Sequence, residues 1–140
     1  YSSAPTFFFF IGKGNNGADG VAAARHCFVS GQSVKVFLLY PDDECSAELL
    51  KQINLARAYC LPLVEGVDEA VLRSHIGRHG NSSLVLIDAI LGIGYQPPLQ
   101  DSLSKIFAYI NSLDLAVVSI TILLFILFLS FINRPLLICF

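Results

Sequence analysis

Glycines and polar side chains are concentrated in two short stretches of the chain, each directly after an apolar run. Residues 12–20 read GKGNNGADG and follow a run of four phenylalanines and an isoleucine. A Gly-x-Gly-x-x-Gly spacing between a strand and a helix lets backbone N–H groups approach a pyrophosphate at the helix N-terminus. The spacing alone is a weak signal, and a tight turn that merely tolerates glycine is the structural alternative.

The side chains of this first stretch suit hydroxyls, amides or a cation better than a bare phosphate. Asn15 and Asn16 add amides where a pyrophosphate loop usually has small residues. We expect Asp19 in the first turn of the following helix, where its carboxylate would repel a phosphate. A nicotinamide-dependent dehydrogenase is the competing hypothesis, with Asp42 or Asp43 as the carboxylate that binds ribose after the second strand.

Apolar runs that read as strands alternate with amphipathic runs that read as helices. Such alternation predicts an α/β fold, a Rossmann-like three-layer sandwich with a mainly parallel sheet, incomplete at the C-terminus. Ligands bind beyond the carboxyl ends of the strands in such sheets, so both glycine-rich loops should meet at one edge. The expected strands are 6–11, 34–40, 83–90 and 115–122, and three of the expected helices are 18–29, 68–76 and 101–112.

Polar residues before the helical runs indicate where helices begin. Asp42 or Asp43 is the expected N-cap of the helix after the second strand, and Asp101 that of the last helix. The first of these helices should bury Leu49, Ile53, Ala56 and Cys60, and the last should bury Leu103, Ile106, Phe107 and Ile110.

The overall composition narrows the classes of function. The chain has 140 residues, a single domain by size, and a net charge of −2 with scattered basic residues, so we expect no nucleic-acid partner. Its four cysteines form no Cys-x-x-Cys pair, which favours free thiols in a reducing compartment. His75 and His79 share the spacing of some zinc ligands, but the neighbouring arginines favour a solvated face. The absence of methionine suggests a fragment without its true N-terminus.

The longer string GKGNNGADGVAAARH, residues 12–26, closely resembles the signature of the NAD(P)H-hydrate epimerase family, with its YjeF N-terminal type of domain. Ala18 stands where the family has a glycine. The second stretch, IDAILGIG at 87–94 followed by YQPPL, is similar to the family's aspartate–alanine pair that closes a strand before a Gly-x-Gly loop. The resemblance covers about 7–122, and we expect 1–122 to form this domain in partial form.

This resemblance implies an isomerase that repairs nicotinamide cofactors by interconverting the R and S epimers of hydrated NADH and NADPH. It implies a potassium ion held by Asn16 and Asp88, whose oxygens suit a hard cation; a turn cap is the alternative role of Asp88. It also implies substrate contacts from both loops, at Asn15, Asn16, Gly17, Ala18, Asp19, Gly92, Ile93, Gly94, Tyr95, Gln96, Pro97 and Pro98.

Three departures from the family bear on activity. Thr121 stands where the family has the aspartate suited to acid–base work, and a threonine hydroxyl cannot take a proton near pH 7 as a carboxylate can. Leu124 or Phe125 stands near the position of a serine that binds potassium. The family's arginine near Gln96 is missing, so phosphate binding should depend on backbone groups and Lys13. We therefore expect weak turnover or none.

The tail at 123–140 is a divergent hydrophobic segment. A frameshifted or mis-spliced end is the favoured interpretation. A membrane anchor is the alternative, because 115–133 carries no charge and is long enough to span a bilayer. However, 115–122 reads as a strand, which leaves only 123–133, a stretch that is short for a span. A non-catalytic, membrane-anchored interaction protein is thus a further rival function. Exposed apolar surface on the tail predicts poor solubility or a homodimer that covers it. We expect a cytoplasmic or mitochondrial location.

Overall fold

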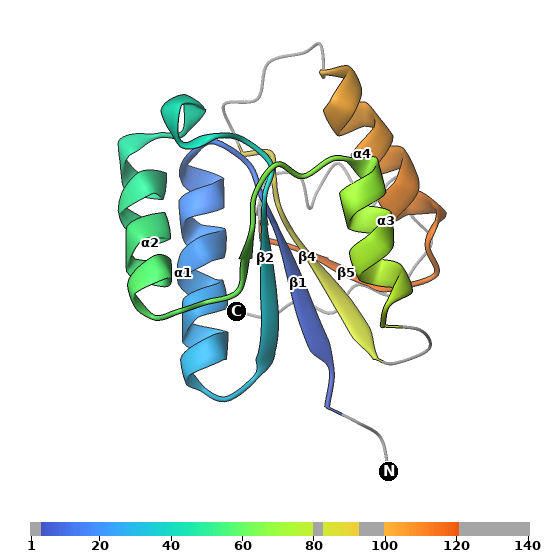
Figure 1. The fold of residues 1–140 in the computed structure, drawn as a ribbon, viewed down its shortest axis with the longest axis horizontal. Coiled ribbons are helices and arrows are strands. Elements are labelled where there is room, and N and C mark those ends of the chain that lie inside the picture. Colours follow the sequence, from blue (N-terminus) through green and yellow to red (C-terminus); the bar gives the residue numbers. More distant parts are fainter. Residues whose placement is uncertain (1–3, 80–82, 93–99, 121–140) are drawn as a thin grey trace.

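The computed structural model describes residues 4–79, 83–92 and 100–120. Strands and helices alternate along this part of the chain, as the sequence predicts (Figure 1). In chain order, the elements are β1 (Thr6–Ile11), α1 (Asn15–Val29), β2 (Ser33–Leu38), a 3₁₀ turn (Asp42–Glu44), α2 (Ala47–Ala58), β3 (Leu63–Val64), α3 (Glu69–Gly77), β4 (Leu84–Ala89), α4 (Asp101–Ser112) and β5 (Ala116–Ser119).

The five described strands form one sheet in the order β3-β2-β1-β4-β5, and every pair is parallel. β1 lies at the centre, paired along its whole length with β2 on one side and β4 on the other. The expected α/β architecture is confirmed. The apolar runs are continuous because helices cover both faces of a parallel sheet.

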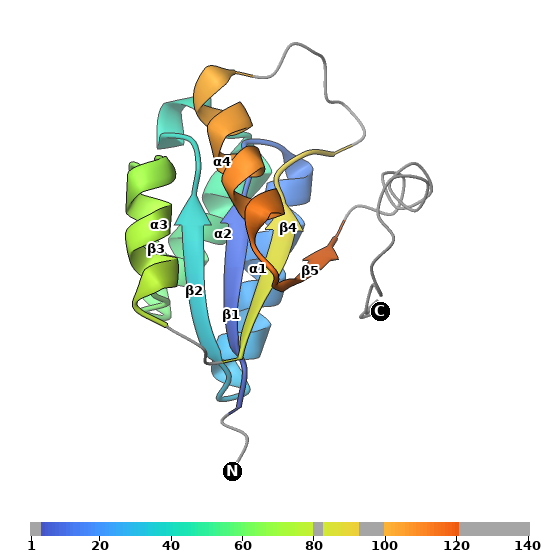
Figure 2. The ribbon, with the colours of Figure 1, turned by 90° about the vertical axis from the view of Figure 1, so that its right-hand side faces the viewer.

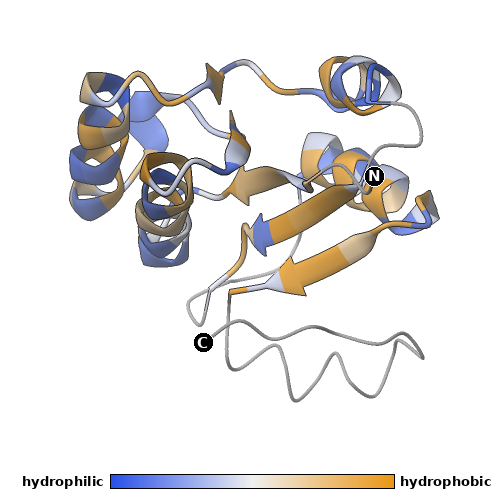
Figure 3. Ribbon diagram, turned by 90° about the horizontal axis from the view of Figure 1, so that it is seen from below, coloured by the Kyte–Doolittle hydropathy of each residue, from blue (hydrophilic) through white to orange (hydrophobic). Residues whose placement is uncertain are grey.

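Alternate residues of each strand point to opposite faces, and this parity divides the core into two clusters. Phe9 and Ile11 of β1 pack with α1 and α2, whereas Phe8 and Phe10 pack with α3 and α4. The sheet therefore lies between two helical layers, with α1 and α2 on one side and α3 and α4 on the other in Figure 1, and Figure 2 looks onto the face that α3 and α4 cover. Its strands are the most hydrophobic part of the ribbon in Figure 3. Phe8, Phe10 and Phe37 are at most 1 % exposed.

The helix after the first glycine-rich loop begins earlier than the sequence suggested. α1 starts at Asn15 instead of residue 18, with Gly14 as its N-cap. Asp19 therefore lies in the second turn of α1 and not in the first. The expected end is confirmed, because α1 stops at Val29 and Gly31 takes a left-handed φ of 84°, a conformation that glycine adopts without strain.

Two predictions about α2 were wrong. Its N-cap is Ser46, not Asp42 or Asp43, because residues 42–44 form a 3₁₀ turn of their own. Cys60 does not belong to its buried face: it is exposed, lies beyond the end of the helix and has a φ of 56°. Leu49, Ile53 and Ala56 are buried as expected.

The remaining elements also differ in detail from the sequence predictions. Gln100, not Asp101, is the N-cap of α4, and its side chain makes no capping bond. Tyr109 is buried in α4, whereas Phe107 is only half-buried. The two-residue strand β3 was not predicted, since two residues carry no recognisable alternation. Asp68 accepts from the N–H of Val71 and caps α3, which begins one residue later than expected.

The helices that follow β1 and β4 pass to opposite faces of the sheet. Val21 and Ala24 of α1 belong to one core cluster, and Leu103 and Ile106 of α4 belong to the other. The chain thus changes direction between two neighbouring strands, and such a switch point opens a crevice at their carboxyl ends. Both glycine-rich stretches leave the sheet at this point.

Gly20 tests how tightly α1 packs on the sheet. A Cβ at Gly20 would lie 2.5 Å from Cβ of Ala89 and 2.8 Å from Cδ1 of Ile11, whereas one at Gly77 of α3 would meet no atom within 4 Å. We expect Gly20→Ala to lower the free energy of unfolding by about 1–3 kcal/mol through overpacking. Gly77→Ala should raise it by about 0.4–1 kcal/mol, because alanine restricts the unfolded chain. Urea denaturation measures both, and equal effects would contradict the packing.

Candidate functional site

The two glycine-rich loops touch directly where they leave the sheet. The N–H of Gly12 donates to the carbonyl of Ala89 at 3.1 Å, which continues the ladder between β1 and β4 by one bond. A Cβ at Gly12 would lie 1.9 Å from the carbonyl oxygen of Ile90. Only glycine fits at position 12, so the first glycine of the motif allows the two backbones to approach each other closely.

Asn16 joins the two loops. Its Nδ2 donates to the carbonyl oxygen of Leu91 at 3.2 Å, over a separation of 75 residues in sequence. A Cβ at Gly92 would lie 3.1 Å from Cβ of Asn16, so this second glycine also allows close contact. The prediction that the two loops lie side by side is confirmed as far as Gly92, and the predicted contacts from Ile93 to Pro98 fall outside the described residues.

The first turn of α1 has backbone donors with no hydrogen-bond partner among the described residues. Its first helical hydrogen bond runs from the N–H of Ala18 to the carbonyl of Gly14 at 3.2 Å. The N–H groups of Asn15, Asn16 and Gly17 therefore have no partner within the helix. Gly14 has no side chain that could cap them. Donors of this kind suit the oxygens of a phosphate or a ribose.

The predicted substrate residues of the first loop divide into two groups. Asn15 and Asp19 are exposed, and Asn16 is half-buried between the loops. Gly17 and Ala18 are buried: a Cβ at Gly17 would lie 2.4 Å from the carbonyl oxygen of Gly12, and Ala18 packs in the core. The side chain of Ala18 thus belongs to the core, while those of Asn15 and Asp19 are accessible from solvent.

Asp88 lies one residue before the end of β4, level with Phe10 of β1 and Ser119 of β5. Its Oδ1 accepts from the N–H of Ile90 at 3.0 Å, which is the turn-capping role that the sequence left open. Burial raises the pKa of the Asp88 carboxyl, and this one hydrogen bond offsets the effect only in part. Among the described residues, no lysine or arginine forms an ion pair with it.

The connection between β2 and α2 borders the first loop, which the sequence did not indicate. The N–H of Ser46 donates to the carbonyl of Lys13 at 2.9 Å, and Nζ of Lys13 lies 5.2 Å from the ring centre of Tyr40. A serine three residues before the first buried leucine of α2 was the available signal. Asp42, the candidate ribose ligand of a dehydrogenase, instead pairs with both terminal nitrogens of Arg57, at 3.0 and 3.2 Å.

Of His75 and His79, only His75 lies on α3, because the helix ends at Gly77; the ring of His79 meets Phe8 edge-on. Nδ1 of His75 lies 3.2 Å from Nζ of Lys35, and its ring meets Phe37 edge-on. Burial, and then the charge of Lys35, lowers the pKa of His75. In the part of the chain that is described, no three His, Cys, Asp or Glu side chains gather as metal ligands. A site that holds a monovalent ion mainly through amide and carboxylate oxygens would not need three such side chains.

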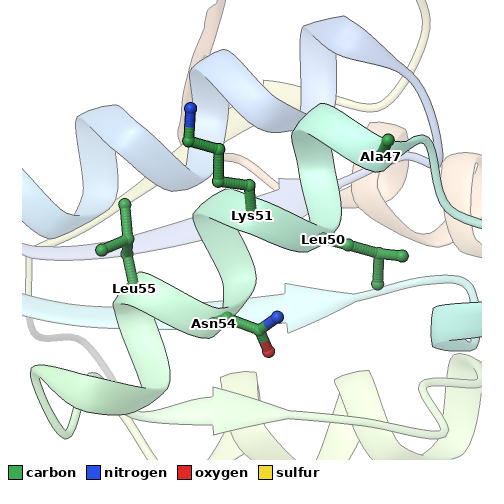
Figure 4. Close-up of a pocket in the computed structure, with 5 residues that line it drawn as sticks. All are labelled: Ala47, Leu50, Lys51, Asn54 and Leu55. Atoms are coloured by element: carbon green, nitrogen blue, oxygen red, sulfur yellow. The ribbon is translucent and has the colours of Figure 1, made fainter.

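A separate hollow lies on the exposed side of α2 (Figure 4). It is lined by residues of one helix only, Ala47, Leu50, Lys51, Asn54 and Leu55. Side chains of a single helix cannot enclose a small molecule, so we place the candidate site at the two loops. None of the helices in the described ranges has the length and apolar character needed to cross a membrane.

The chain is similar to known proteins in sequence. The chain is 28 % identical over 109 residues to the NAD(P)H-hydrate epimerase of Oenococcus oeni, a match that covers 78 % of this chain and 47 % of that protein. It is 36 % identical over 112 residues to the bifunctional NAD(P)H-hydrate repair enzyme Nnr of Dictyoglomus turgidum, covering 79 % of this chain and 20 % of the relative.

A solved structure has a similar fold. The crystal structure of yeast ynu0, YNL200c, superposes with a TM-score of 0.69 at 25 % identity, over 84 % of this chain and 47 % of the yeast chain. This chain thus spans about half the length, or less, of these relatives. The family model described as YjeF-related protein N-terminus matches residues 1–122. With the two loops joined as this family's motifs predict, the chain belongs to the YjeF-related N-terminal domain family.

Proposed function

We propose that this chain is the nucleotide-binding core of an NAD(P)H-hydrate epimerase, which interconverts the R and S epimers of hydrated NADH and NADPH. The observation that carries the proposal is the bond from Asn16 to the carbonyl of Leu91. This bond joins the two motif loops into one site at the switch point of the sheet, where such folds bind nucleotides. The relatives named as NAD(P)H-hydrate epimerases support the same reaction.

In this proposal, the free N–H groups at the start of α1 hold the phosphates and riboses of the hydrated cofactor. The side chains of Asn15 and Asp19 are exposed there and suit the hydroxyls of the ligand. Lys13 is an exposed cation next to these donors and would balance part of the pyrophosphate charge. Residues Gly92 to Pro98 complete the substrate site from the second loop.

Potassium is the proposed cofactor, held by Asn16 and Asp88. The donor set fits a hard monovalent cation, because Nδ2 of Asn16 is engaged by Leu91 and its Oδ1 takes no part in that bond. The half-buried carboxyl of Asp88 lacks a cationic partner among the described residues, and a bound ion would supply one. The ion would stabilise negative charge next to the loops when it is bound.

Two further features of the proposal come from the sequence alone. Thr121, at the family's aspartate position, and the tail at 123–140 lie outside the described residues. We therefore propose low turnover only from the presence of a threonine at position 121. A cytoplasmic or mitochondrial location and a homodimer likewise remain predictions. Ligand titration distinguishes this proposal from the two rival functions, a membrane-anchored interaction protein and a dehydrogenase.

Ligand titration separates the candidate functions. We expect hydrated NADH or NADPH to bind at least about tenfold more tightly than unmodified NADH, because a repair enzyme must ignore the abundant intact cofactor, and tenfold corresponds to about 1.4 kcal/mol. Calorimetry with the three ligands measures this ratio. Tight binding of NADH with no response to the hydrates would favour the dehydrogenase. Binding of none of them, with co-sedimentation on vesicles, would favour the interaction protein.

The partly buried carboxyl of Asp88 predicts a dependence of stability on pH. Because burial raises its pKa in the folded state, protonated Asp88 stabilises the fold below the pKa of the unfolded chain. This stability is lost as the pH rises through the folded pKa. Without potassium at pH 7, Asp88→Asn should therefore raise the free energy of unfolding by about 1–3 kcal/mol, since it removes the charge and keeps an acceptor for Ile90.

Potassium should reverse this order of stability between the parent and Asp88→Asn. It should stabilise the parent at pH 7 and leave Asp88→Asn unaffected, because only the parent keeps the anionic ligand. Asp43→Asn, which alters an exposed carboxylate, is the matched control and should change neither response. Thermal melts with potassium or tetramethylammonium chloride at pH 4 and pH 7 provide the measurement. An equal potassium response in parent and Asp88→Asn would contradict the assignment of this ligand.

Turnover should be limited by the residue at position 121. Loss of a positioned acid–base group costs roughly 10²–10⁴ in rate, so we expect the parent to epimerise R-hydrated NADH slowly or not at all. Thr121→Asp should raise the rate, and Thr121→Asn, which has similar size but no titratable group, should not. Chiral separation of the two epimers follows the reaction. A parent rate normal for such enzymes would show that the acid–base group lies elsewhere.

A further inference from the structure

The connection from β2 to α2 makes contacts along the first half of the glycine-rich loop. The N–H of Ser46 donates to the carbonyl of Lys13 at 2.9 Å, and Oγ of Ser46 lies 3.5 Å from Oδ1 of Asn15. The first distance is that of a strong hydrogen bond and the second is at the outer limit for one. The backbone of Ser46 is thus the main anchor of the loop on this side.

The same serine is fixed by its role in α2. Its Oγ accepts from the N–H of Leu49 at 3.2 Å and caps the helix, and its backbone takes φ −63° and ψ 155°. Leu49 is fully buried beneath it, in the core that α2 shares with α1. The direction of the Ser46 N–H is therefore set by a packed helix, and through it the position of the Lys13 carbonyl.

Lys13 is held at its other end as well. Its Nζ lies 5.2 Å from the ring centre of Tyr40, within the range of a cation–π contact. The N–H of Leu39 donates to the carbonyl of Ile11 at 3.1 Å, directly before the loop. The loop is thus held on two sides, by residues 39–46 at Lys13 and Asn15, and by Leu91 at Asn16.

We propose that Ser46 is a positioning residue for the substrate site, because it orders the loop that carries Lys13, Asn15 and Asn16 before a ligand binds. The inference rests on the proposed function in that hydrated NADH or NADPH is the ligand. Ser46 itself touches no reacting atom. A loop ordered in advance loses less conformational entropy on binding, so a defect at Ser46 weakens substrate affinity and leaves the chemical step unchanged.

Two substitutions distinguish the contacts of the Ser46 hydroxyl from the contact of its backbone N–H. Ser46→Ala removes the hydroxyl and keeps the N–H. Ser46→Pro also removes the N–H and places a ring carbon where its proton was, so the Lys13 carbonyl must move. Proline suits this position otherwise, because φ is −63° and the preceding Cys45 has an extended backbone at φ −84° and ψ 149°. Ser46→Thr keeps the hydroxyl and the N–H and should behave like the parent.

Asp68→Ala is the matched control. Asp68 caps α3 as Ser46 caps α2, with Oδ1 accepting from the N–H of Val71 at 2.8 Å. α3 packs on the opposite face of the sheet, in the other core cluster. Asp68→Ala should therefore lower the melting temperature about as much as Ser46→Ala and leave the first loop unaffected.

The experiment compares the dissociation constant of hydrated NADPH with the backbone amide order parameters of Gly14 to Gly17, measured by NMR without ligand. We expect the order parameters to fall and the dissociation constant to rise by about fivefold or more in Ser46→Pro, the scale of one hydrogen bond. Smaller changes of the same sign are expected in Ser46→Ala. Neither quantity should change in Ser46→Thr or Asp68→Ala.

The two readouts distinguish a failure of this inference from a failure of the proposed function. If the parent does not bind hydrated NADPH, the proposed function is wrong, and the order parameters alone decide the role of Ser46. If Ser46→Pro does not fold, Ser46→Ala against Asp68→Ala decides it. Loop order parameters in Ser46→Pro and Ser46→Ala equal to those of Asp68→Ala would overturn the inference.

Discussion

The close approach of two backbones at Gly12 is the constraint on which the rest of the site depends. The N–H of Gly12 bonds to Ala89, and the carbonyl of Ile90 occupies the space that any Cβ at position 12 would need. Because β1 and β4 are neighbours in register along six residues, their two exits are forced into contact. The helices that follow then pass to opposite faces, which leaves the crevice open above this contact.

The crevice combines rigid supports with groups that are short of partners. α1 is packed so closely on the sheet that Gly20 has no room for a methyl group, and this fixes the direction of the free N–H groups at its first turn. Asp88 is half-buried at the same edge, and its carboxylate accepts one backbone hydrogen bond. A carboxyl that is only partly compensated and three N–H groups without a partner among the described residues lower the stability of this edge, as is common at binding sites. A cation and an anionic dinucleotide would complement both features.

The fold was largely predictable because its signals are local and strong. The buried strand at Thr6–Ile11 is continuous and apolar, and its bounds were predicted to the residue. The joined loops followed from the rule that parallel strands end at one edge. The role of Ser46 was missed because acidic Asp42 and Asp43 are equally good caps by type, and only packing of Leu49 decides where α2 begins. Asp19 was placed one turn too early, because asparagine and glycine at 15–17 do not read as helix.

The central claim is that one crevice, between the loops after β1 and β4, binds hydrated nicotinamide cofactor. The most direct measurement is a map of amide chemical-shift changes on titration with hydrated NADPH in potassium buffer. The account predicts that the largest changes fall on residues 12–19 and 88–92, with little change on α3 or on the outer side of α2. Changes centred on α3, or on the hollow lined by Ala47 and Leu55, would contradict it.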